Sequence, residues 1–154
     1  MTIALAAAAV ALAATSVADA ARVHAFRAKY IGTGSGQATA TGASGHASGS
    51  GTGNVIGPGR FSVAATAVVL SETCASFDGR FTLKGRGGRI VLTAHDVRAC
   101  APESAGAKFA FSGTATVTGG TRKFAGARGT LSFSGAYVKE TGAVTISFKG
   151  RVRY

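Results

Sequence analysis

The last twelve residues of the chain, AVTISFKGRVRY, alternate apolar and polar side chains along their whole length. The apolar positions are Val144, Ile146, Phe148, Val152 and Tyr154, and the polar positions between them are Thr145, Ser147, Lys149, Arg151 and Arg153. Successive side chains of a β-strand point to opposite faces, so this pattern has the period of a strand and not of a helix. We therefore predict a strand over residues 143–154 with one buried face and one solvated face.

The same alternation recurs upstream, and glycine-rich turns separate the segments. Residues 85–88 and 139–142 have the composition of tight hairpin turns, in which glycine supplies a positive φ. Short strands separated by such turns are typical of an all-β sandwich or barrel, and a closed barrel leaves no exposed edge. We expect an all-β fold, a small antiparallel β-barrel. The predicted upstream strands lie in residues 24–30, 60–70, 77–85, 89–97, 108–119 and 129–138.

Residues 32–59 are rich in glycine and allow two interpretations. As a low-complexity segment they would form a flexible linker. The glycines at 32, 34 and 36, and again at 49, 51 and 53, also recur with a period of two. This spacing indicates two strands that have a bare face and approach a neighbouring backbone closely. We favour the strands.

The first twenty residues have the pattern of a secretory signal. An apolar run from Ile3 to Ala14 precedes Ala18-Asp19-Ala20, which matches an A-x-A cleavage site. We predict a signal-peptide helix over residues 1–20 and a single β-barrel domain over residues 21–154, located in the extracellular space, the periplasm or the cell envelope. A membrane anchor is the alternative, but the run is short for a span and rich in alanine.

The chain is strongly basic, with 17 Lys and Arg, 6 Asp and Glu, and a net charge of +11. Loss of residues 1–20 leaves 17 basic against 5 acidic residues, a net charge of +12. Such a charge favours anionic partners such as envelope polymers, lipid head groups or nucleic acid. The basic residues are scattered along the sequence, which is typical of a solubilising surface. Nucleic acid is not expected, because no recognition motif or set of stacking aromatic residues accompanies the charge.

The chain contains two cysteines, Cys74 and Cys100, which span 27 residues. In an exported protein an even pair predicts a disulfide, and the alternative is two separate buried thiols. The predicted hairpin between them would bring both to the same edge. Two cysteines and three scattered histidines do not have metal-ligand spacing, so we expect neither a metal nor a cofactor.

A glycine-rich segment, GGTRKFAGARG at residues 119–129, raises the question of a phosphate-binding loop. Such a loop lies between a strand and the N-terminus of a helix, whereas this one precedes the predicted strand at 129–138. We interpret it as a β-connection in which Phe124 is buried as an anchor and the glycines allow the turns. The structural residues of this motif are Gly119, Gly120, Phe124, Gly126 and Gly129. The alternative is an anion site formed by Arg122, Lys123 and Arg128.

The longer segment VTGGTRKFAGARGTLSFSG, residues 117–135, resembles the GGTG-[KR]-F-x-x-A-x-G pattern of the dirigent and allene oxide cyclase barrels, including their short secreted bacterial relatives. The resemblance implies an eight-stranded antiparallel barrel with a central apolar cavity, and often a homo-oligomer. Plant members guide radical coupling or cyclise an epoxide with acidic and polar residues inside the barrel. This sequence departs from the pattern at Arg122, where the family usually has glycine.

Candidate chemical groups are few. Either Asp96 or His95 would face the barrel interior near one mouth, depending on the phase of the strand at 89–97, and could act as an acid or base. The alternative is a strand end at which both meet solvent. Tyr30, Tyr137 and Arg128 are candidates for ligand contacts, and the alternative for the two tyrosines is a core role. On the solvated face we expect an ion pair between Asp78 and Arg80.

The combined features favour a secreted, non-catalytic barrel that binds an apolar small molecule or an anionic envelope polymer. Two alternatives stay open. The chain could be an isomerase or cyclase of the dirigent type, with its chemistry in the cavity, or a structural protein of the cell envelope. An enclosed cavity with convergent polar groups would favour the enzyme, and a tightly filled barrel would favour the other functions.

Overall fold

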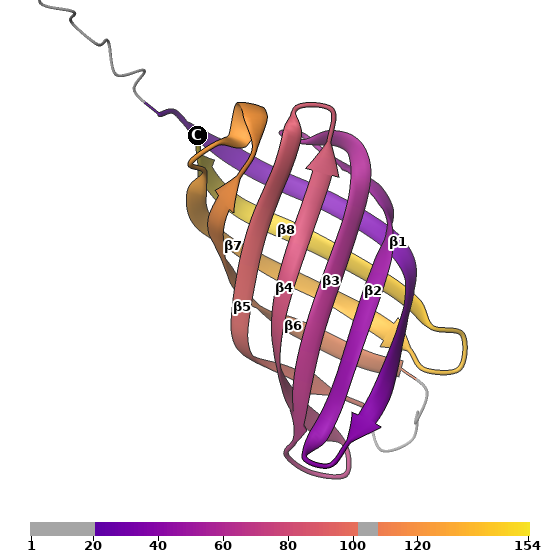
Figure 1. Cartoon of the computed structure of the whole chain (residues 1–154). Coiled ribbons are helices and arrows are strands. Elements are labelled where there is room, and N and C mark those ends of the chain that lie inside the picture. Colours follow the sequence, from indigo (N-terminus) through magenta and orange to yellow (C-terminus); the bar gives the residue numbers. More distant parts are fainter. Residues whose placement is uncertain (1–20, 102–107) are drawn as a thin grey trace, which may run out of the picture.

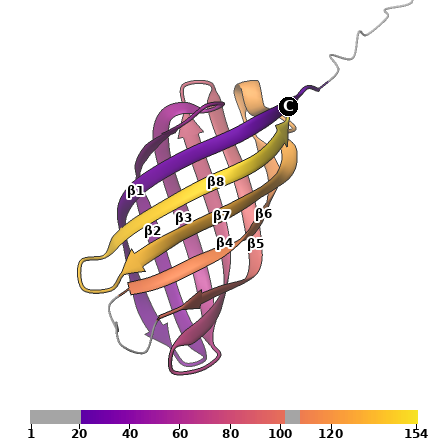
Figure 2. The same ribbon diagram turned by 180° about the vertical axis from the view of Figure 1, so that it is seen from behind.

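A computed structural model of the chain describes residues 21–101 and 108–154 and shows one closed antiparallel barrel (Figures 1 and 2). Each strand pairs with the next along the chain, and β1 pairs with β8 to close the circle. A short 3-10 helix, η1 (Arg122–Phe124), lies between the sixth and seventh strands. The strands are β1 (Val23–Thr39), β2 (Gly42–Gly53), β3 (Gly57–Val69), β4 (Cys74–Gly85), β5 (Gly88–Cys100), β6 (Lys108–Gly120), β7 (Arg128–Val138) and β8 (Ala143–Arg153).

The predicted fold class, a small antiparallel β-barrel of eight strands, is confirmed. Both predicted hairpin turns join the expected strands, and the glycine-rich segment forms the second half of β1, all of β2 and the start of β3. The predicted signal peptide, residues 1–20, lies outside the described residues. Within the described part of the chain, no helix is long and apolar enough to cross a membrane.

Alternation along the strands produces the core. In β8 the side chains of Val144, Ile146, Phe148 and Val152 are buried, and the polar residues between them are exposed. The other strands contribute inward residues in the same way, so apolar side chains from around the barrel meet inside it. Apart from Tyr30, no residue with a polar side chain is buried among the described residues. The interior is therefore almost wholly hydrocarbon.

The glycines of β1 and β2 bring these strands into close contact. Gly32 and Gly49 are Cα partners in the β1–β2 ladder. A Cβ atom added to Gly32 would collide with the carbonyl oxygen of Ser48, and one added to Gly49 would collide with that of Ile31. Glycine at such positions allows strong local curvature of a sheet. The glycine-rich sequence is thus needed for the tight wall that β1 and β2 form.

One end of the barrel, which we term the closed end, carries η1, the β2–β3 and β4–β5 turns and the C-terminus (Figure 1). The Phe124 ring is completely buried there and packs edge-on against Tyr154, with 5.0 Å between ring centroids. The backbone N–H of Lys123 donates a 3.1 Å hydrogen bond to the carbonyl of Gly87. The glycine-rich connection therefore folds back and covers this end of the core.

Arg122 has a φ of 55°, which is the left-handed conformation that glycine adopts at least cost. This is the position at which the sequence departs from the dirigent-type pattern. Gly126 in the same connection has a φ of 71°. Gly126 occupies a variable position of the pattern, whereas Gly129, its last glycine, has a φ of 154°. The backbone geometry therefore accounts for the glycine of the pattern at positions 122 and 129.

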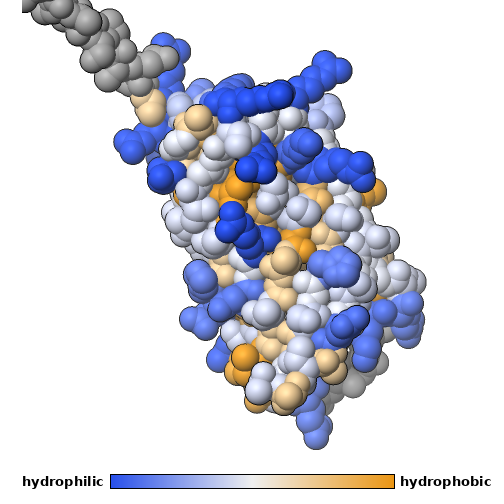
Figure 3. Space-filling model, viewed as in Figure 1, coloured by the Kyte–Doolittle hydropathy of each residue, from blue (hydrophilic) through white to orange (hydrophobic). Residues whose placement is uncertain are grey.

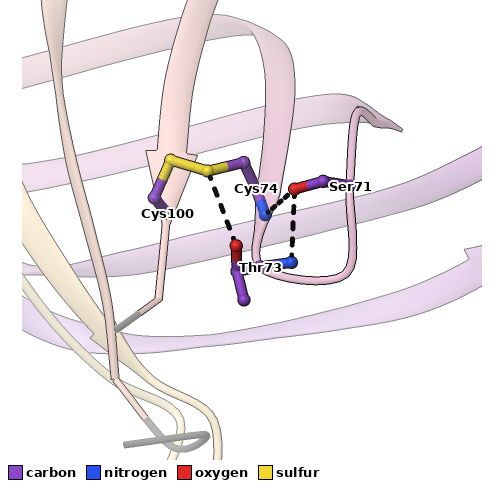
Figure 4. Close-up of a disulfide and its surroundings, with 4 residues drawn as sticks. All are labelled: Ser71, Thr73, Cys74 and Cys100. Atoms are coloured by element: carbon purple, nitrogen blue, oxygen red, sulfur yellow. Dashed lines mark hydrogen bonds between the residues drawn. A yellow bond between two sulfur atoms is a disulfide. The ribbon is translucent and has the colours of Figure 1, made fainter. Parts of the chain in front are cut away.

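The opposite end, which we term the open end, carries the β1–β2 and β7–β8 turns and the β3–β4 connection, and the disulfide between Cys74 and Cys100 lies there. The two cysteines are Cα partners at the ends of β4 and β5, as the hairpin predicts. Figure 4 shows the Ser71 hydroxyl accepting hydrogen bonds from the backbone N–H groups of Cys74 (3.1 Å) and Thr73 (3.4 Å). A disulfide such as this one is typical of proteins in oxidising, extracytoplasmic compartments.

Replacement of Phe124 by alanine should destabilise the barrel by about 3–5 kcal/mol, because the ring is fully buried at the closed end. Thermal and denaturant unfolding measure the loss. Lys123→Ala is the matched control, since this exposed side chain touches the same rings only from outside. Equal melting temperatures for the two variants would contradict the anchoring role of Phe124.

Replacement of both Cys74 and Cys100 by serine should lower the free energy of unfolding by about 3–4 kcal/mol, because the bond restricts the unfolded chain. Reduction of the wild-type protein should lower its stability by a similar amount. Alkylation followed by mass measurement checks the bond itself. Two freely alkylated thiols in the unreduced protein would refute it.

Candidate apolar cavity at the open end

A cavity of about 330 Å³ lies inside the barrel at the open end. Side chains of two kinds surround it. One side, which we term the small-residue wall, comes from β1, β2 and β3, and the other, the aromatic wall, comes from β4, β6 and β7. The small-residue wall consists of Gly34, Gly36, Ala43, Gly45, Ala47, Ala65 and Ala67. The aromatic wall consists of Phe77, Phe81, Phe109, Phe111 and Tyr137.

The cavity follows from a change in the size of the inward-facing residues along β1 and β3. Toward the closed end, β1 and β3 point Phe26, Tyr30 and Phe61 inward, and these fill the barrel. Toward the open end their inward positions hold only glycine and small or medium aliphatic residues. Eight strands enclose a space that large side chains can fill or that can hold one small ligand. Glycine and alanine leave part of that space empty.

Three residues of the aromatic wall, Phe77, Phe81 and Phe111, belong to one network of ring contacts with the core residues Phe133 and Phe148. Phe77 and Phe111 meet edge to face with centroids 6.0 Å apart, and Phe111 contacts Phe133 at 6.4 Å. Below them, Phe81 lies 5.2 Å from Phe133 and 5.7 Å from Phe148. Such tilted and edge-on pairs hold the rings in fixed orientations. The cavity therefore offers preformed aromatic surfaces to a guest on one side and the small-residue wall on the other.

The cavity lining is poor in groups that could perform proton chemistry. Among the described residues, no aspartate, glutamate, lysine or arginine lines it. Its titratable side chains are Tyr137 and, on the outer rim, His46, which is exposed. The arrangement is therefore suited to holding an uncharged apolar molecule and provides no carboxylate acid or base within the described lining.

Tyr30 lies in the core rather than in the cavity lining. Its side chain is 1% exposed and packs against Phe61 and Phe148, with ring centroids 5.6 and 6.4 Å away. The hydroxyl is buried and makes no hydrogen bond to any described residue. Burial raises the pKa of Tyr30 from its ordinary value of 10.0 to about 12. Tyr137, the other predicted tyrosine, is half-buried in the cavity wall.

His95 and Asp96 do not face the interior, because a β-bulge interrupts β5. Ala94 and Val97 both point inward, so two residues lie between them on the outer side. Asp96 takes a φ of 52°, a left-handed conformation that aspartate tolerates better than most residues. Both side chains are exposed, as in the alternative of a solvated strand end. Strict alternation could not reveal a bulge, although the His-Asp pair in an apolar strand was a signal for one.

The bulge also changes the partner of Asp78. We expected a pair with Arg80, but the Asp78 carboxylate lies 3.5 Å from Nδ1 of His95, and it accepts a 2.9 Å hydrogen bond from the backbone N–H of Asp96. Both side chains of the His95–Asp78 pair are more than half exposed. They border a hollow on the outer surface that is also lined by His46 and Arg80. Solvated groups of this kind hold the bulge together and do not form a cavity site.

Arg128 is engaged with the backbone of its own loop. Its guanidinium Nη1 donates hydrogen bonds to the carbonyls of Ala127 (2.8 Å) and Thr118 (3.0 Å). Arg122 and Lys123 are exposed on the same connection. Gly120 packs so closely against the carbonyls of Phe124 and Arg89 that a Cβ atom would not fit. The glycine-rich segment thus closes the barrel, and Arg128 contributes to that structure.

The fold and the cavity together define a small all-β barrel with an apolar internal site. Among solved structures, the chain is similar to a protein described as pyocyanin demethylase, with 16% identity and a TM-score of 0.50. The match covers 84% of this chain and 99% of the other. At this identity the likeness concerns the fold alone. No family model and no curated protein sequence matches the chain.

Replacement of Tyr30 by phenylalanine should stabilise the barrel by about 1–3 kcal/mol at neutral pH, because it removes a buried hydroxyl that lacks a partner. The wild type should also lose stability as pH rises from 10.0 toward 12, since the unfolded chain releases this proton first. Unfolding at several pH values tests both effects. Tyr137→Phe is the control. A Tyr30→Phe variant with the same pH profile as wild type would contradict the assignment.

Proposed function

We propose that the protein binds a small, uncharged, largely apolar molecule in the cavity at the open end. The observation that carries this proposal is the pairing of an aromatic wall with a small-residue wall around about 330 Å³ of space. Ligand pockets in proteins start at roughly 300 Å³, so the guest is a compound of one or two rings or a short chain. Phe77, Phe111 and Tyr137 would contact its faces and edges.

The binding role agrees with the chemistry of the lining. An apolar molecule that enters such a cavity loses its contact with water and gains contacts with the rings. A charged guest would find no described countercharge in the lining and would have to leave its hydration shell. The cavity therefore selects for an uncharged ligand.

The location of this function follows from the disulfide. We infer that the barrel works outside the cytoplasm, because the bond between Cys74 and Cys100 persists in oxidising compartments. The predicted signal at residues 1–20 supports the same location. An export assay with N-terminal sequencing of the mature protein tests this inference, and cleavage between Ala20 and Ala21 is the expected result.

A cyclase or isomerase role is the second candidate, and specific likenesses favour it. Residues 117–135 resemble the dirigent and allene oxide cyclase barrels, and the fold is similar to that of pyocyanin demethylase, an enzyme by its name. Chemistry of that kind needs an acid, a base or another reactive group beside the guest. Among the described lining residues, Tyr137 is the inward-facing titratable group. Binding without turnover is the simpler assignment. If the protein is an enzyme, Tyr137 would donate or accept the proton.

Titration with the fluorescent probe N-phenyl-naphthylamine tests the proposed binding. Wild type should bind the probe, and Ala65→Phe or Ala67→Phe should weaken binding at least about tenfold, because the added ring occupies the cavity. Both variants should keep or raise the melting temperature, since they fill empty space.

The matched control is Ala64→Phe, which adds the same ring to the adjacent, exposed position of β3. It should bind the probe like wild type. The proposal fails if both cavity variants are folded and still bind the probe normally, or if the control loses binding to the same extent.

A further inference from the structure

Charge is distributed very unevenly over the barrel. The acidic side chains of the described residues are Glu72, Asp78, Asp96 and Glu140, which lie in β4, β5 or the connections of the open end. β1, β7 and β8 contain no acidic residue. In the space-filling view the most hydrophilic side chains gather around the closed end, at the top of Figure 3. The basic excess is therefore concentrated away from the mouth of the cavity.

The register of the strands assembles basic residues from distant parts of the sequence. β7, β8 and β1 lie side by side at the front of Figure 2. Arg153 of β8 is the Cα partner of Arg128, and Lys149 is the partner of Arg27. Arg151 lies between these two rows. We term these five residues the basic ridge: Arg27, Arg128, Lys149, Arg151 and Arg153.

The ridge carries uncompensated positive charge. All five side chains are exposed, and none forms a salt bridge within the described residues. Like charges on neighbouring strands destabilise the sheet slightly. Positions between them hold small residues such as Ala25, Thr130 and Gly150, and shallow hollows flank β8 on both sides. An anionic group can therefore approach the backbone closely and neutralise several cations at once.

The spacing of the ridge indicates the shape of the partner. Residues 149, 151 and 153 project from one face of β8 and repeat every two residues, or about 6.7 Å. A regular line of cations on a convex barrel can contact an extended chain with regularly repeated anions along its length. A flat anionic surface would reach fewer of these cations at once. Arginine suits phosphate and sulfate groups, because its guanidinium forms two parallel hydrogen bonds to them.

We propose that the basic ridge binds a linear polymer with phosphate or sulfate groups along its length. This site is independent of the cavity, because it lies on the outer surface toward the closed end. The protein would then be held on an anionic polymer while the mouth of the cavity stays free. No aromatic side chain projects from the ridge to stack on nucleotide bases.

Titration with inorganic polyphosphate at several salt concentrations tests the proposal. Wild type should bind with an affinity that falls as salt rises, because bound counterions are released. The triple variant Lys149→Thr, Arg151→Thr, Arg153→Thr should bind at least about tenfold more weakly, and its log–log salt slope should fall by about 2. Heparin, a sulfated polymer, is the parallel probe. It should also bind to the wild type more tightly than to the triple variant.

The matched control removes the same charge elsewhere, through Arg80→Thr, Arg98→Thr and Lys108→Thr, which are exposed positions outside the ridge. It should keep most of the affinity. Equal losses in both triple variants would overturn the site, because binding would then follow net charge alone. Binding to phosphatidylglycerol vesicles without binding to polyphosphate, or tenfold tighter binding of oligothymidylate with the same number of phosphates, would also overturn it.

Discussion

The ladder between β1 and β8 closes the sheet, and every other feature of the molecule depends on that closure. Its register runs from Val23 opposite Arg153 to Thr33 opposite Ala143 and joins the two ends of the described barrel. A closed sheet has no free edge, and its inward side chains all meet in one interior. The same ladder places Arg27 beside Lys149, so it creates the basic ridge as well as the enclosed space.

The closed end of the barrel contributes most to stability, and the open end holds the proposed binding site. At the closed end, Phe124 and the glycine-rich connection complete a core of large apolar side chains. At the open end, glycine and alanine leave space beside the rings, so packing contributes less to stability there. The disulfide of Cys74 and Cys100 lies at this less densely packed end and holds β4 to β5 next to the cavity residues Phe77 and Ala99. The disulfide thus contributes stability at the end of the barrel where the cavity makes the packing less dense.

Sequence alone predicts the strands and hairpins well, because alternation and turn glycines are local signals. It predicts the buried Phe124 for the same reason. The solvent exposure of His95 and Asp96 agrees with one of the sequence-based alternatives, but alternation could not select it, since one bulge reverses the phase of a strand. The small-residue wall and the basic ridge depend on how β1 registers with β2 and with β8, which is not a local property. Basic residues that are scattered along the sequence therefore form one surface, and the glycine-rich segment, for which strands were favoured over a linker, forms much of one wall of a cavity.

The central claim is that the barrel holds an apolar space between the small-residue wall and the aromatic wall. A crystal structure of residues 21–154 under xenon pressure tests it directly, because xenon enters dry apolar cavities without specific recognition. The account predicts xenon density beside Ala65 and Ala67, in contact with Phe77 and Phe111. An interior without a xenon site, in which these phenylalanine rings pack directly against the glycines and alanines of β1, β2 and β3, would contradict it.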